Sequence, residues 1–177
     1  MNVQINPRVA AVMGGLVADS AALGLHWLYD AGRIAQIEKT DGLAFLKANA
    51  DYYADTSGYF VHGHKPVGDS SGYGELCLLM LKHLAQHKKF DRVAYQTEYR
   101  AHFGPGGAFA GFIDTATRLT LRKLLPLTPE EFEEQSGADD DQFAALAMLP
   151  ALVASHHQSQ SDLLPLVEGS TVSTKHG

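Results

Sequence analysis

The sequence of 177 residues has one cysteine, one tryptophan and fewer basic than acidic residues. Because Cys77 has no partner for an internal disulfide, the chain suits a reducing compartment, and we expect the cytoplasm. Fourteen basic against twenty acidic residues give a net charge of −6, which argues against nucleic acid or an anionic membrane as the main partner. No uninterrupted apolar run reaches about 18 residues, and the N-terminus lacks the basic and apolar regions of a secretory signal. The sequence therefore predicts neither a membrane span nor a leader.

The remaining composition is that of an ordinary globular protein, with 45% apolar and 19% charged residues. A chain of this length suits one domain, so we expect residues 1–177 to form a single all-helical unit. The chain ends on GSTVSTKHG without a closing helix. This ending predicts that the unit is the N-terminal portion of a longer domain, incomplete at its C-terminus.

The stretch GGLVADSAALGLHWLYD, residues 14–30, organises the sequence. Apolar residues around it recur at helical spacing, with Asp19 in their midst (Val9, Val12, Met13, Leu16 and Val17). A helix that is apolar on most faces is usually buried, and a buried acid needs a partner. We therefore predict a central buried helix that presents a polar and aromatic cluster at its C-terminal end. The alternative is a plain core helix in which Asp19 caps or bonds to a neighbour.

The rest of the chain predicts an all-α fold. Helices are expected over 32–49 (broken at 41–42), 71–86, 91–102, 108–124 and 143–155, with a short element over 163–167. Residues 59–64 form the one plausible strand. Cys77 falls at helical spacing with Met80 and Leu84, which favours a packing role over a nucleophilic one.

Three groups of carboxylates fall near predicted helix N-termini. These are Asp19 with Asp30, Asp69 with Glu75, and Asp139 with Asp140 and Asp141. Paired acids could bind a hard cation such as Mg²⁺ through their oxygens, or act in general acid–base chemistry. The alternative is structural, because the helix dipole favours acids in a first turn without any ligand.

Other candidate motifs are weaker. His62 and His64 have a spacing compatible with a metal, but no third ligand follows at a recognisable distance, so a polar loop is the better interpretation. Residues 104–107, GPGG, lack the features of a phosphate-binding loop. Trp27 and Tyr73 could stack on a flat ligand, although such aromatics usually serve packing.

Several stretches, taken in order, resemble the ADP-ribosylglycohydrolase family, which includes dinitrogenase reductase-activating glycohydrolases and a lens crystallin. GGLVADSAALGLHW resembles the family's opening Gly-Asp-Ala-Leu-Gly helix, with Asp19 as the family aspartate. GDSSGYGELCLLMLKHL resembles the segment with Thr-Asp-Asp-Thr before an apolar helix. GAFAGFIDTATRLTLRKL resembles the Gly-rich turn and Thr-Thr-Arg helix, with Thr117 and Arg118 as the matching pair. SGADDDQFAALAMLPALVA resembles the Asn-Gly-Ala-Ala-Met-Arg segment.

This resemblance implies a compact multi-helix orthogonal bundle and removal of ADP-ribose from a modified side chain with the help of two Mg²⁺ ions. Family members are longer than this chain and carry a further acidic metal motif. The sequence also departs from the family at critical positions. His26 falls where many members have a functional glutamate, and the two metal-binding aspartates fall on Gly72 and Tyr73. Neither glycine nor tyrosine replaces a carboxylate as a Mg²⁺ ligand.

The leading hypothesis is a divergent hydrolase that cleaves an ADP-ribosyl or related glycosidic bond in a small-molecule or ADP-ribosylated substrate. Asp19, Asp69 and Glu75 would supply its carboxylates, with Asp69 and Glu75 as the candidates for any Mg²⁺ site. The substrate pocket would be lined by His26, Trp27, Tyr73, Asp139 and Asp140. The alternative is a non-catalytic ligand-binding or structural protein, like the crystallin, that keeps the family fold.

Overall fold

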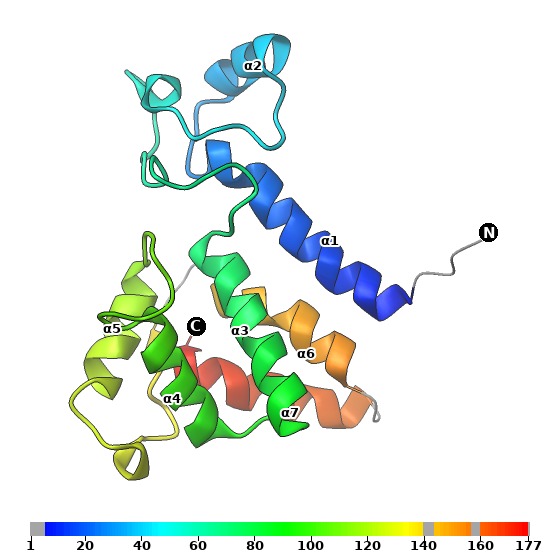
Figure 1. The fold of residues 1–177 in the computed structure, drawn as a ribbon, viewed down its shortest axis with the longest axis vertical. Coiled ribbons are helices and arrows are strands. Elements are labelled where there is room, and N and C mark those ends of the chain that lie inside the picture. The colour runs from blue at the N-terminus through cyan, green and yellow to red at the C-terminus, as the bar shows by residue number, and fades with distance from the viewer. Residues whose placement is uncertain (1–5, 140–143, 157–159, 177) are drawn as a thin grey trace.

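The computed structural model describes residues 6–139, 144–156 and 160–176 of the chain. Within these ranges the fold is an all-α bundle, as predicted, drawn in Figure 1. Its α-helices are α1 (Pro7–Ala22), α2 (Ala31–Thr40), α3 (Gly72–His87), α4 (Arg92–Phe103), α5 (Thr115–Leu124), α6 (Leu149–Ser155) and α7 (Gln160–Thr174). Short 3-10 turns are η1 (Leu23–Leu25), η2 (Ala50–Tyr53), η3 (Pro129–Glu131) and η4 (Ala144–Met148). The strands β1 (Ala138–Asp139) and β2 (Lys175–His176) form one short parallel pair.

Helix α3 forms the centre of the bundle. It packs against α1, α4, α6 and η4, and its large apolar residues, such as Leu76 and Met80, are almost completely buried. The other core side chains include Tyr95, Tyr99 and Leu152. Cys77 is buried in the same core, and burial raises the pKa of its thiol, so the predicted packing role is confirmed.

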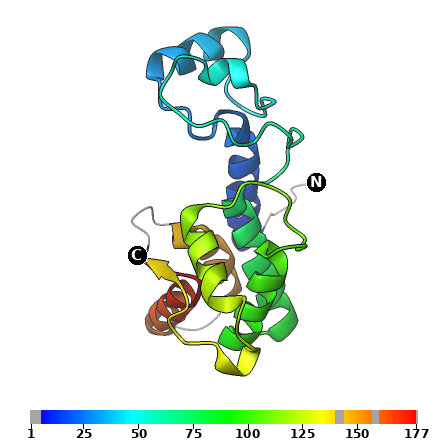
Figure 2. The same cartoon turned by 90° about the vertical axis from the view of Figure 1, so that its left-hand side faces the viewer.

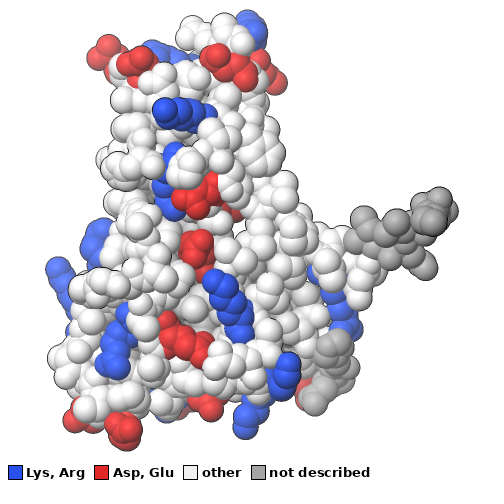
Figure 3. Space-filling view, viewed as in Figure 1, with Lys and Arg blue, Asp and Glu red and all other residues white. Residues whose placement is uncertain are grey.

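The prediction that α1 is the buried central helix is wrong. In α1, Val12 is buried, whereas Val9, Met13 and Val17 are each about half exposed, at 54%, 53% and 49%. One side of α1 packs on α6 and α3, and Figure 3 shows a largely uncharged surface over this helix. The physical reason is that, among the described residues, only one side of α1 has neighbouring helices, so Val9, Met13 and Val17 on the other side stay exposed.

The same region qualifies the expectation about membrane spans. By length and composition alone, the stretch Pro7–Leu25 is apolar enough to cross a membrane, although a core helix or a signal sequence would pass the same test. Two observations account for it as part of the bundle: its packing on α6 and α3 and the bonding of Asp19 to the start of α3.

Helix α2 and the loop before α3 form a lobe at the far end of α1, away from the main bundle (Figures 1 and 2). The lobe is held by a bridge between Leu28 and Gly58 and by the Tyr53 hydroxyl, which donates to the His26 carbonyl at 2.9 Å. Residues 43–49 are not helical and residues 59–64 are not a strand, so both predictions are wrong. The repeated glycines and prolines of this stretch break regular structure.

The other helices follow their caps. Helices α3 and α4 lie within one residue of the predicted ranges, and Asp91 caps α4 by accepting from the Ala94 amide at 3.1 Å. Helix α5 begins seven residues later than the predicted start at 108, because Asp114 caps it at Thr115. Helix α7 is longer than the predicted element over 163–167 and contains Pro165. The predicted helix over 143–155 divides into η4 and α6.

Candidate functional site

Asp19 bonds directly to the start of α3. Its carboxylate accepts hydrogen bonds from the Ser71 amide at 2.8 Å and from the Ser71 hydroxyl at 2.5 Å. The same hydroxyl oxygen caps α3 by accepting from the Tyr73 amide at 3.0 Å. A carboxylate at a helix N-terminus is stabilised by the helix dipole. Asp19 therefore ties α1 to α3, which fits the alternative interpretation that it bonds to a neighbouring helix.

The close approach of these helices requires a glycine at position 74. A Cβ atom added to Gly74 would lie 2.3 Å from an Asp19 carboxylate oxygen, far inside van der Waals contact. At Gly72, two residues earlier, the nearest atom to an added Cβ would be the Phe112 carbonyl oxygen at 3.5 Å. Space therefore excludes a Cβ atom at position 74 and allows one at position 72.

His26 forms an imidazole pair with His62. His26 ends η1, and its Nδ1 lies 2.8 Å from Nε2 of His62, with the rings nearly parallel. One of these two nitrogens must carry a proton and donate it, and the other must accept it, so a single proton lies between the two rings. Burial lowers the pKa of both rings, to about 4 for His62, where the neighbouring His26 and Lys65 add to the effect. Both imidazoles are therefore neutral near pH 7.

Aromatic side chains close the space around this pair. His26 contacts the rings of Trp27 and Tyr73, and Trp27 packs edge-on against Phe112. The remaining pocket between these side chains has a volume of about 10 Å³, which is room for about one water molecule. The structure thus brings three predicted pocket residues together (His26, Trp27 and Tyr73), in a cluster that is packed shut.

Asp69 and Glu75 have separate partners. Asp69 accepts from Nζ of Lys65 at 2.8 Å, and this hydrogen bond lowers the pKa of the Asp69 carboxyl. The Lys65 ammonium also lies over the Phe109 ring, 4.8 Å from its centre. Glu75, in the first turn of α3, pairs with Nε2 of His102 on α4 at 2.9 Å. Each carboxylate is already engaged by a base of its own.

The remaining predicted site residues lie elsewhere. Asp139 is exposed in β1, which lies beside α5 and pairs with β2. Asp140 and Asp141 fall outside the described residues. Asp30 caps α2 by accepting from the Arg33 amide at 2.8 Å. A structural capping role therefore accounts for Asp30, as the dipole argument allowed.

The residues present do not fit the Mg²⁺ pair that the family resemblance implies. Gly72 and Tyr73 offer no carboxylate where the family has two aspartates. In the described part of the chain, three imidazole, thiol or carboxylate ligands converge at one place, formed by His83, His87 and Glu98. That place is on α3 and α4, and it includes none of the predicted site residues. The carboxylates proposed as Mg²⁺ ligands are instead bonded to separate protein groups.

Two sets of polar contacts were not predicted from the sequence. The Ser71 capping interaction was visible as a serine at the start of an apolar helix, but its link to Asp19 spans 52 positions. The pair His83 and His87 was visible as two histidines four residues apart on one helix face. Its partner Glu98 comes from the next helix, which no local spacing predicts.

Two curated proteins are similar to this chain. Crystallin J1A of Tripedalia cystophora is 30% identical over 156 residues, which is 82% of this chain and 45% of the crystallin. Crystallin J1B of the same organism is 30% identical over 165 residues, covering 85% and 47% respectively. The chain thus spans about half the length of the curated relatives it matches. No model of a known protein family matches the sequence, and no solved structure matches it.

These similarities fit the family resemblance only loosely. Both relatives are crystallins, and a lens crystallin was part of the family that the sequence motifs resemble. The described part of this chain is thus an all-α fold, and its sequence is similar to those of two crystallins. The particular chemistry of this chain has to be argued from its own residues.

Proposed function

We propose that this protein has a structural, crystallin-like role and keeps an ADP-ribosylglycohydrolase-type fold without hydrolytic activity. The similarity to two crystallins supports this proposal. The single buried cysteine is compatible with a cytoplasmic location. The proposal assigns Asp19 and Ser71 to the stability of the bundle.

The observation that carries the proposal is the composition of the pocket beside α3. Gly72 and Tyr73 take the place of an aspartate pair in the family resemblance. The pocket that they share with His26 holds about 10 Å³, and the pocket between Tyr73 and Asp19 holds about 150 Å³. A sugar or nucleotide needs a pocket of several hundred cubic ångströms. Asp69 and Glu75 are bound to Lys65 and His102, so recruiting them would require breaking both pairs.

Calorimetric titration with ADP-ribose, with and without Mg²⁺, tests this role. We expect no saturable heat in either titration and no release of ADP-ribose from an ADP-ribosylated protein. Circular dichroism on the same sample must show a folded helical protein, so that a negative result concerns the site. Metal-dependent binding or turnover would contradict the structural role.

A second candidate, the divergent hydrolase, is favoured by the imidazole pair. A neutral imidazole has a nitrogen free to accept a proton, and His62 Nδ1 is buried without a hydrogen-bond partner. In this candidate His26, Trp27 and Tyr73 line an opened pocket. Asp19, Asp69 and Glu75 supply the carboxylates, with Mg²⁺ as the expected cation.

The double variant Asp69→Asn/Glu75→Gln separates the two candidates. If the hydrolase assignment is correct, the wild-type chain releases ADP-ribose and the double variant is inactive while its circular dichroism spectrum is unchanged. Equal turnover of the two proteins would refute the assignment of these carboxylates. No turnover in either protein would leave the structural role as the better supported proposal.

A further inference from the structure

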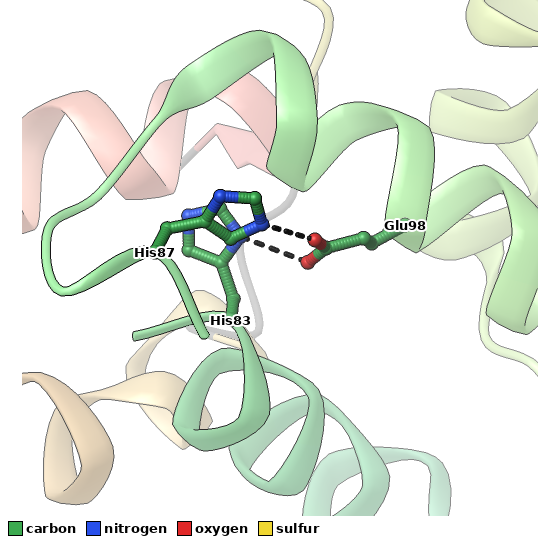
Figure 4. Close-up of side chains that lie close together, drawn as sticks. All are labelled: His83, His87 and Glu98. Carbon is green, nitrogen blue, oxygen red and sulfur yellow. Dashed lines mark hydrogen bonds and ion pairs between the residues drawn. The ribbon is translucent and has the colours of Figure 1, made fainter. Parts of the chain in front are cut away.

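Two histidines of α3 point toward one carboxylate of α4. Nδ1 of His83 lies 2.8 Å from one oxygen of Glu98, and Nε2 of His87 lies 2.8 Å from the other. Figure 4 shows both rings directed at the same carboxylate. The three ligand atoms lie within 4.8 Å of one another. A tetrahedral ion with bonds of about 2.0–2.2 Å holds its ligand atoms about 3.3–3.6 Å apart, so small rotamer shifts of the half-exposed His87 and Glu98 would close the three ligands around one ion.

The surroundings of this cluster divide it into a buried and an open side. The side chain of His83 is completely buried, whereas those of His87 and Glu98 are 27% and 28% exposed. Phe90 and Tyr95 pack edge-on against the His83 ring. An ion held here would therefore be anchored by the core and remain reachable from solvent.

We propose that His83, His87 and Glu98 form a binding site for a zinc-class divalent transition-metal ion. The ligands are His83 Nδ1, His87 Nε2 and a Glu98 oxygen, with water in the fourth position. Two histidines four residues apart on a helix, completed by a carboxylate from another element, match a known zinc ligand set. Imidazole ligands favour zinc over Mg²⁺.

The residues between the histidines indicate binding rather than peptide-bond chemistry. The sequence from His83 to His87 is HLAQH. Leu84 stands where zinc proteases of the H-E-x-x-H type have their general base. The site is separate from the pocket of His26 and from the family's implied Mg²⁺ ligands, so the proposal goes beyond the proposed function.

The proton positions predict a specific consequence of metal binding. The Asp91 amide donates to Nε2 of His83 at 3.0 Å, so without metal Nδ1 of His83 carries the proton that it donates to Glu98. When Nδ1 binds an ion, the proton moves to Nε2, and Nε2 no longer accepts from Asp91. Metal binding must therefore release the Asp91 amide at the start of α4.

Zinc titration of the metal-free protein tests the proposal. After treatment with a chelator and its removal, calorimetry should give saturable binding of one zinc ion. At free zinc one hundred times the Kd, the thermal midpoint should rise by about 5–10 °C. In spectra of ¹⁵N-labelled protein, the Asp91 amide should shift and exchange faster with solvent, a change that zinc bound at surface histidines would not cause.

Variants of the two half-exposed ligands keep the test independent of folding. His87→Gln and Glu98→Gln should each weaken zinc binding by more than about tenfold, with circular dichroism confirming the fold. The matched control is His64→Gln, which replaces an exposed histidine outside the cluster and should bind zinc like the wild type. Absence of saturable binding in the folded wild type would overturn the proposal. Unchanged binding in His87→Gln and Glu98→Gln would do the same.

Discussion

Replacing Ser71 with alanine should destabilise the protein through two separate losses. The hydroxyl oxygen caps α3 through the Tyr73 amide, and loss of a serine N-cap costs about 1 kcal/mol. The hydroxyl proton is donated to Asp19, and a hydrogen bond to a charged group contributes about 1.5–3 kcal/mol. Because the Ser71 amide still donates to Asp19, the carboxylate keeps one partner. We expect the free energy of unfolding to fall by about 2–4 kcal/mol.

Thermal and urea unfolding, followed by circular dichroism, measure this loss. For a chain of this size the midpoint should drop by about 4–16 °C. Ser70→Ala is the matched control, because Ser70 bonds to Asp69 through its backbone amide, which the substitution retains. That variant should stay within about 0.5 kcal/mol of wild type.

A double-mutant cycle isolates the contact between the two side chains. Asp19→Asn, Ser71→Ala and the double variant should show a coupling energy of about 1–2 kcal/mol, since the residues are in direct contact. If the two effects simply add, Asp19 and Ser71 do not stabilise each other, and the reasoning about the link between α1 and α3 is refuted.

Three further predictions test the packing and the buried imidazole. In urea unfolding, Gly74→Ala should lower the free energy of unfolding by about 1–3 kcal/mol, because its Cβ would overlap a carboxylate oxygen. Gly72→Ala, where a Cβ has room, should be neutral or stabilising. Val12→Ala should cost about 1–3 kcal/mol and Val17→Ala under about 0.5 kcal/mol, following their exposures of 6% and 49%. Burial lowers the pKa of His62 to about 4 in the folded protein, from an ordinary value of 6.5. As the pH falls, the unfolded chain therefore binds a proton at His62 before the folded protein does. The contribution of His62 to stability is therefore full above pH 6.5 and is lost as the pH falls toward 4, a loss of about 2–4 kcal/mol. In unfolding curves measured across this range, His62→Gln should show a smaller loss of stability than the wild type.

Each of these predictions has a result that would contradict it. Equal costs for alanine at positions 72 and 74 would mean that the backbone relaxes around the new methyl group. Equal costs for Val12 and Val17 would mean that α1 is buried on both sides. For His62, the control is His64→Gln at an exposed position, and the prediction fails if the two variants lose stability equally between pH 6.5 and 4.

The sequence predicted those helices well whose caps and apolar faces agree. In α3 and α4, a serine or aspartate cap is followed by large apolar residues at helical spacing, so local and tertiary preferences coincide. The same signals misplaced α1, because apolarity shows that a face can be buried but not whether another helix covers it. They also misplaced the start of α5, because the helix begins directly after its cap Asp114 and not at the apolar residues that precede it.

The candidate site was predictable only in part. His26, Trp27 and Tyr73 were predicted as pocket residues, and the structure brings the rings of Trp27 and Tyr73 against His26. Contacts between distant segments, such as the pairing of His26 with His62 across 36 positions, have no local signature. The partners of Asp69 and Glu75 were equally invisible, because an acid near a helix start looks the same with a cation or with a neighbouring base.

The N-terminus of α3 shows how the proposed structural role differs from the Mg²⁺ chemistry that the family resemblance implies. Two adjacent aspartates at this end repel each other and need a bound ion to offset the repulsion. With Gly72 and Tyr73 in those positions, the Asp19 carboxylate accepts two hydrogen bonds from Ser71 at the helix start. Glu75, in the first turn of the same helix, pairs with His102. Tyr73 also fills the pocket beside His26. Under the proposed structural role, the carboxylates at this helix start are therefore stabilised by protein groups, Ser71 for Asp19 and His102 for Glu75.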